Sequence, residues 1–300
     1  METEPKIGSP VVVCLSWAVA IAAFPLALMV AAVGQGLGAM AGGCQWIGLS
    51  LPLGRQVWAL VNQPVMNFSS LPSASGYWLG SLILPLIIAS GIIPLLPRAR
   101  SLLAELSVVH IAWSTALVAG AWLPLIDSDD GHFVRWLSHQ DWPQEGVWAA
   151  PVLASIIALV PTIRLLEMAR RRQTSARSIA RFEIVAIHLG FPLVAWVVLT
   201  TLVRGSLPVA ATIGAALPLV TSLTVAWMRY PAPYVRPLEP TTPLRFAGVL
   251  VAAALIAVFV WFAGRPHPEG RSAGLLWGTP QAFNNIRPWI EPWSANPDGQ

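Results

Sequence analysis

Charged residues are scarce in this sequence. They make up 11% of its 300 residues, and Lys6 is the only lysine. About a quarter of the residues in a typical soluble domain are charged, so this composition is not that of a soluble protein. Because no apolar segment contains a lysine, a chromophore held as a lysine Schiff base is excluded.

Cysteines and familiar catalytic motifs are also missing. Cys14 and Cys44 are the only cysteines, which is too few for a disulfide framework, and they do not form a CxxC pair. The sequence contains no HExxH motif, no EF-hand loop and no Gly-x-Ser-x-Gly elbow. No nucleophile or acid–base pair can be named, so the sequence leaves open whether the chain is an enzyme.

Apolar residues are abundant instead. They account for 55% of the chain, and its mean hydropathy is +0.64. Apolar runs of about 20 residues recur, which is the length that a helix needs to cross the hydrocarbon core of a bilayer. The sequence therefore predicts an all-α, polytopic transmembrane helix bundle of about seven spans. The expected spans are 10–33, 76–97, 102–126, 147–166, 182–203, 206–228 and 245–264.

The basic residues lie in short loops between these runs. There they act as topology signals and do not form a nucleic-acid-binding surface, although the formal net charge is +4. With the N-terminus in the cytoplasm, twelve Lys and Arg residues lie on the inner side and six on the outer side. The positive-inside rule thus predicts a multi-pass protein of a bacterial-type inner (plasma) membrane, with a cytoplasmic N-terminus and an extracytoplasmic C-terminus.

An internal repeat is the most informative pattern. The segment ARSLLAELSVVH, which ends at His110, returns as ARSIARFEIVAIH, which ends at His188. In each copy a glutamate, Glu105 or Glu183, precedes the histidine by five residues. The pattern predicts a duplicated helix pair. The expected organisation is a single bundle over 1–264, with repeat units at about 76–126 and 146–203 and a degenerate third unit at about 206–264, followed by a tail over 265–300.

The two repeated histidines are the candidate site. A parallel duplication relates its halves by an axis along the membrane normal, so His110 and His188 are expected at matching depth, about 10 Å from the inner surface. An ionisable residue inside a bilayer is a functional hypothesis because its burial is costly. We expect the two imidazoles to face each other as metal or cofactor ligands, most naturally of a b-type haem, with Trp113 and Phe191 in an apolar cradle. The structural alternative, in which each histidine hydrogen-bonds to a neighbouring helix, stays open.

The repeated glutamates are expected to act differently. Five residues correspond to about 140° around a helix, so Glu105 and Glu183 do not share a face with their histidines. Ion pairs with Arg100 and Arg177 of the basic turns are expected instead.

Three segments outside the repeat carry further expectations. The outer segment 35–75 begins with small residues that allow close backbone approach, and its part 46–64 is expected to form an amphipathic or re-entrant helix. The acidic segment 127–145, with His132 and His139, is expected to be an exposed loop whose role the sequence does not define. The Trp- and Pro-rich tail 265–300 is expected to be unstructured or to bind protein partners at the outer face.

Three functions remain compatible with these patterns. The favoured one is a cofactor-binding, electron-transfer subunit of a larger membrane complex with a bis-histidine centre, because it gives both histidines a shared purpose. The second is a transporter or permease component built on the duplicated helix pair. The third is a non-catalytic structural subunit of a membrane complex. All three share the lipid bilayer as partner, and none involves nucleic acid.

Overall fold

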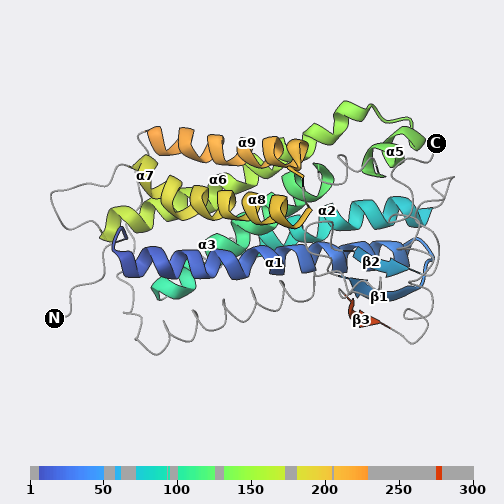
Figure 1. Cartoon of the computed structure of the whole chain (residues 1–300), viewed down its shortest axis with the longest axis horizontal. Coiled ribbons are helices and arrows are strands. Elements are labelled where there is room, and N and C mark those ends of the chain that lie inside the picture. The colour runs from blue at the N-terminus through green and yellow to red at the C-terminus, as the bar shows by residue number, and fades with distance from the viewer. Residues whose placement is uncertain are drawn as a thin grey trace.

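A computed structural model of the chain describes residues 7–50, 58–61, 72–92, 94, 101–125, 132–172, 181–204, 206–228 and 275–278. The predicted transmembrane helix bundle is confirmed, since six helices within these ranges are long and apolar enough to cross a membrane. They lie side by side along the long axis of the molecule (Figure 1). The expected span 245–264 lies outside the described residues.

The six spans are built from the following elements. They are α1 (Pro10–Ala41), α2 (Pro72–Ile92), α3 (Leu102–Leu117) with the π-helix η2 (Val118–Trp122), η3 (Gln144–Trp148) with α6 (Ala149–Arg172), α7 (Arg181–Val185) with the π-helix η4 (Ala186–Gly190) and α8 (Phe191–Arg204), and α9 (Val209–Trp227). A further short helix, α5 (His132–His139), lies between the third and fourth spans. The repeat itself stays a prediction.

Helix α1 is longer than the predicted span. Its 32 residues extend about 48 Å, against about 30 Å for the hydrocarbon core. The extension packs against α2 through glycines: a Cβ atom added to Gly38 would lie 1.9 Å from the carbonyl oxygen of Gly76, and one added to Gly80 would lie 2.0 Å from that of Gly34. These small residues permit the close backbone contact that the sequence predicted.

A small antiparallel sheet lies at the far end of α1 from its N-terminus (Figure 1). Its strands are β1 (Trp46–Ser50), β2 (Trp58–Val61) and β3 (Leu275–Gly278), in the order β2-β1-β3. The helix expected over 46–64 is therefore wrong. Trp, Ile and Val favour strands, and they recur in both segments. The side-chain oxygen of Gln35 accepts a hydrogen bond of 3.0 Å from the backbone N–H of Ala59, which ties β2 to α1.

Two π-helical turns interrupt the spans, and a proline accounts for each. Proline has no backbone N–H, so it cannot continue the hydrogen-bonding ladder. Just before Pro124 the N–H of Leu123 bonds to the carbonyl five residues back, and just before Pro192 the N–H of Phe191 does the same. The widened turn η4 contains His188.

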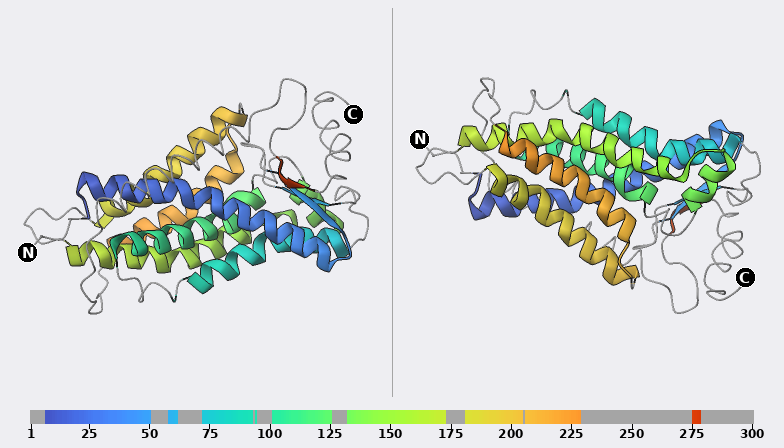
Figure 2. Two further views of the ribbon diagram at one scale, coloured as in Figure 1. Left: turned by 90° about the horizontal axis from the view of Figure 1, so that it is seen from below. Right: turned by 90° about the horizontal axis from the view of Figure 1, so that it is seen from above.

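The span formed by α3 and η2 is the most buried of the six, because it packs against α1, α2 and α6. Helix α8 starts close to α1 and diverges from it toward its C-terminal end, as both views of Figure 2 show. Because α3 belongs to the most buried span, its residue His110 lies at the centre of the bundle.

Candidate functional site

The structure brings the two repeated histidines to one cavity. His110 on α3 and His188 in η4 are 2% and 1% exposed, and both line a cavity of about 20 Å³. The other lining residues come from α1, α3 and the η4–α8 segment: Ala20, Phe24, Trp113, Ser114, Leu117, Leu189, Pro192, Leu193 and Trp196. The expected convergence of the two imidazoles is thus what the fold provides.

His110 is held by a side chain of α1. The hydroxyl Oγ of Ser16 and the Nε2 atom of His110 share a hydrogen bond of 2.7 Å, and both side chains are buried. A fixed partner on one ring nitrogen sets the orientation of an imidazole, and because a hydroxyl group can donate or accept, this bond is compatible with either tautomer of His110. Ser16 therefore leaves Nδ1 as the remaining ring nitrogen of His110.

His188 occupies a different environment. Its Nδ1 atom is buried and has no hydrogen-bond partner among the described residues. The backbone of Ile7, just before α1, lies against the ring. A buried polar atom without a partner is costly, and such atoms need an explanation such as an unseen water, an ion or a catalytic role.

The turn that carries His188 is also held by α1. In a π-helical turn each backbone carbonyl accepts a hydrogen bond from the N–H five residues further on. For the carbonyl of Ile187 in η4 that residue is Pro192, which has no N–H. The indole N–H of Trp17 donates a hydrogen bond of 2.8 Å to that carbonyl. The indole thus satisfies a backbone group that the proline leaves free.

Helix α1 was missed as part of the site because it lies outside the repeat. Among the described residues, eight threonine and serine side chains bond to the backbone carbonyl four residues back: Thr115, Ser138, Ser155, Thr162, Thr201, Thr212, Thr221 and Thr224. Ser16 bonds to a histidine of another helix instead. The sequence does contain an indication that α1 belongs to the site. Ser16 and Trp17 are adjacent, and they bring a hydroxyl group and an indole N–H into one apolar run.

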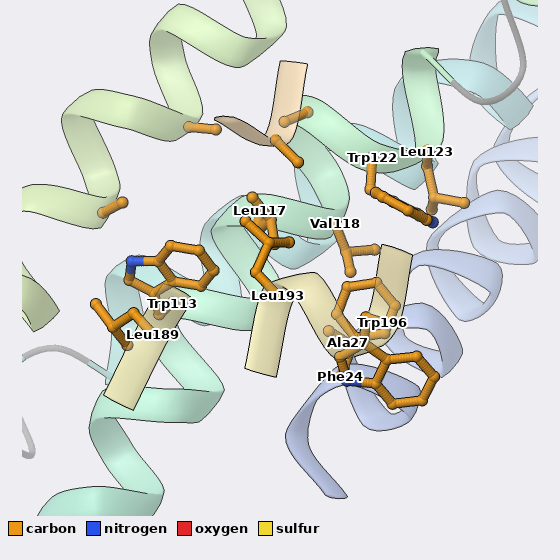
Figure 3. Close-up of a cluster of buried hydrophobic side chains, with 14 of the residues drawn as sticks. Phe24, Ala27, Trp113, Leu117, Val118, Trp122, Leu123, Leu189, Leu193 and Trp196 are labelled. Atoms are coloured by element: carbon orange, nitrogen blue, oxygen red, sulfur yellow. The ribbon is translucent and has the colours of Figure 1, made fainter. Parts of the chain in front are cut away.

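Aromatic and aliphatic side chains form the rest of the wall. Figure 3 shows Trp113 beside Leu189 at one end of a buried cluster and Phe24 with Trp196 at the other end. The rings of Phe24 and Trp196 stack with centroids 4.5 Å apart, which joins α1 to α8. Trp113 therefore lies at the cavity as expected.

Phe191 does not join the cavity. Its side chain is 54% exposed and pairs with Trp17 at a ring-centroid distance of 5.9 Å. Phe191 shares an outward face of α8 with Val194 and Val198, which follow at helical spacing and are also exposed. Phe24 and Trp196, and not Phe191, are the aromatic residues that line the cavity beside Trp113.

The other candidate residues are dispersed. Glu105 is buried whereas Glu183 is exposed, so the two copies differ here. Their expected partners Arg100 and Arg177, and the aspartates of 127–130, lie outside the described residues. The expectation of an exposed loop over 127–145 is wrong for part of this segment, because His132 and His139 are the end residues of the helix α5, whose Trp136 and Leu137 are buried. Among the described residues no group of three or more His, Cys, Asp or Glu side chains is placed to hold a metal ion.

The geometry limits what this site can hold. A cavity of about 20 Å³ has room for one water molecule or one bare ion. Pockets for drug-sized ligands and cofactors occupy about 300–1,000 Å³. Neutral imidazoles can ligate a metal ion, or they can accept and donate protons in a hydrogen-bonded chain.

Comparison of the chain with known protein families, with characterised proteins and with solved structures finds no match.

Proposed function

We propose that this chain is an integral inner-membrane subunit that binds a redox cofactor between His110 and His188 and transfers electrons within a larger complex. The observation that supports this function is the meeting of two buried imidazoles, from α3 and η4, at one cavity with otherwise mainly apolar walls. Intramembrane ionisable residues that face the interior of a bundle commonly mark functional sites.

Haem b is the cofactor suggested by the pair of histidine donors, and it would supply one-electron chemistry when bound. The donors His110 and His188 and the aromatic walls suit it, but the present volume of about 20 Å³ does not. Haem binding would require α8 to separate from α3 around the cavity. A smaller centre would need no such rearrangement.

The two other functions have less support. A transport pathway requires polar groups along its course, whereas the side chains lining this cavity are mostly apolar. A structural subunit would explain the bond between Ser16 and His110, which joins α1 to α3. It would leave the cavity that the two histidines share without a role.

With the orientation proposed from the basic residues, the sheet would lie on the extracytoplasmic side of the membrane. Strand β3 belongs to the tail, and it pairs with β1 of the same chain. Binding of a protein partner by the remainder of 265–300 stays a proposal.

The test is the absorbance and metal content of the protein purified in mild detergent. A redox centre predicts a chromophore or a bound metal that is lost in His110→Ala and in His188→Ala. The matched control is Ser222→Ala, which removes a buried hydrogen bond of 2.8 Å to Thr162 on α6, away from the cavity. A colourless, metal-free protein that stays so after reconstitution with haem and with metal ions would overturn the proposal.

A further inference from the structure

We propose that the cavity between His110 and His188 binds one soft monovalent metal ion, Cu(I) in the cell and Ag(I) as its redox-inert analogue, with the two imidazoles as ligands. This inference rests on the part of the proposed function that makes the two histidines the ligands of the centre, and it does not require electron transfer. It names the size, charge and coordination number of the occupant.

The size of the cavity favours a single ion. Its volume of about 20 Å³ accommodates one small occupant, and both histidines contribute to its wall. Within the part of the chain that the structure describes, Ser114 is the only other lining residue with a hydroxyl group. The occupant is therefore small enough to lie between two side chains without moving the helices.

The number and type of ligands favour two-coordinate Cu(I). A structural Zn²⁺ site uses four ligands, and a catalytic one uses three protein ligands and a water molecule. Within the described residues no third His, Cys, Asp or Glu accompanies the pair. Imidazole nitrogen suits copper, whereas Mg²⁺ and Ca²⁺ prefer sets of oxygen ligands.

The charge of the site favours a monovalent ion. Among the described residues, those that line the cavity include no carboxylate and no thiolate, so two neutral imidazoles leave the charge of the ion uncompensated. The Born cost of burying an ion grows with the square of its charge, so a divalent ion costs about four times as much as a monovalent one of equal size. The indole rings of Trp113 and Trp196 line the same cavity, and aromatic faces attract cations.

Each ring also has a support outside the cavity. Ser16 occupies Nε2 of His110, and the backbone of Ile7 lies against His188, whose Nδ1 has no partner among the described residues. Metal-bound histidines usually use their second nitrogen in this way, which fixes the ring and raises its basicity as a ligand.

The test is a titration of the purified full-length protein with Ag(I) in mild detergent, in competition with a chelator of known affinity. We expect one equivalent to bind, and X-ray absorption to show two nitrogen neighbours. His110→Asn and His188→Asn, which keep a polar side chain of similar shape, should each weaken binding at least 100-fold. Ser222→Ala should bind Ag(I) as the unaltered chain does.

The outcomes separate this inference from the proposed function. One bound Ag(I) in a chain that shows no redox centre would retain the ion site and remove the electron-transfer function. A haem bound by the two histidines would retain that function and overturn the ion site. Absence of binding, or binding that both asparagine variants retain while gel filtration shows them folded, would also overturn it.

Discussion

The indole N–H of Trp17 donates a hydrogen bond of 2.8 Å to the carbonyl of Ile187, the residue directly before His188. This bond joins α1 to a π-helical turn that exists because Pro192 cannot supply a backbone N–H. π-Helical turns are rare and are frequent at functional sites. The position of His188 therefore depends on a tryptophan that lies outside the repeat.

Trp17→Phe tests that dependence. Phenylalanine keeps an aromatic ring beside Phe191 but removes the N–H, so the carbonyl of Ile187 loses its partner. Hydrogen bonds between membrane helices contribute about 0.6 kcal/mol on average and up to about 1.7 kcal/mol. We expect the free energy of unfolding to fall by about 1 kcal/mol, measured by titration with a denaturing detergent. Trp227→Phe, at the highly exposed end of α9, should change it much less.

The stability lost with the hydrogen bond between Trp17 and Ile187 should depend on whether residue 192 is proline. In Pro192→Ala the alanine N–H can bond to the carbonyl of Ile187, because residue 192 lies five positions after it. Trp17→Phe should therefore cost less in the Pro192→Ala background than in the natural chain. An equal cost in both backgrounds, measured as a double-mutant cycle, would show that the indole does not compensate for the missing proline N–H.

A second prediction concerns the glycine contact between α1 and α2. In Gly38→Ala the added Cβ would lie 1.9 Å from the carbonyl oxygen of Gly76, so the helices must separate. Overpacking of this kind costs about 1–3 kcal/mol. We expect a lower midpoint of unfolding in the same detergent titration.

Gly91→Ala is the matched control on α2. A Cβ at Gly91 would meet nothing within 4 Å, and alanine is the better helix former. Its unfolding midpoint should stay unchanged or rise. Equal losses in Gly91→Ala and Gly38→Ala would show that the loss does not come from the contact between α1 and α2.

The sequence predicted those features that depend on local pattern. Apolar runs of spanning length and small residues at a helix contact can each be recognised from a few neighbouring residues. The repeat then singled out His110 and His188, and both line the cavity. That step was possible because a histidine is unusual in an apolar helix.

Features that depend on distant pairing were not predictable in the same way. Strand β3 pairs with β1 across more than two hundred residues of chain, so 46–50 and 275–278 gave no local signal for a sheet. Phe191 follows His188 by about one helical turn, the spacing at which two side chains can share a helix face, but its side chain lies on the outward face of α8.

Removal of the Gln35 amide provides a third prediction, for the sheet. Gln35 is buried on α1, and its oxygen accepts the N–H of Ala59 on β2. In Gln35→Leu that N–H has no replacement partner, and a buried unsatisfied donor costs about 1–3 kcal/mol. We expect hydrogen exchange at the Ala59 amide to accelerate about 10-fold or more, since each 1.4 kcal/mol is a factor of ten.

Exchange along the centre of α3 should stay unchanged in Gln35→Leu, because the sheet lies at the far end of α1. An unaltered exchange rate at Ala59 would show that pairing with β1 alone protects that amide.

Ser16 provides the final prediction, since it holds His110 through a hydrogen bond of 2.7 Å between buried side chains. In Ser16→Ala the Nε2 atom of His110 loses this partner, and the ring is no longer fixed. Loss of such a supporting partner typically lowers metal affinity 10–100-fold, and we expect a decrease of about that size for Ag(I). Ser16→Thr retains the hydroxyl and should bind more tightly than Ser16→Ala.

Ser81→Ala is the matched control for Ser16→Ala. Ser81 is also buried, but its hydroxyl donates to the carbonyl of Trp78 in its own helix, away from the cavity. Ser81→Ala should leave Ag(I) affinity unchanged even if it alters the free energy of unfolding. If Ser16→Ala and Ser81→Ala lower the affinity equally, the effect comes from general destabilisation of the bundle, and Ser16 has no specific role in holding His110 as a ligand.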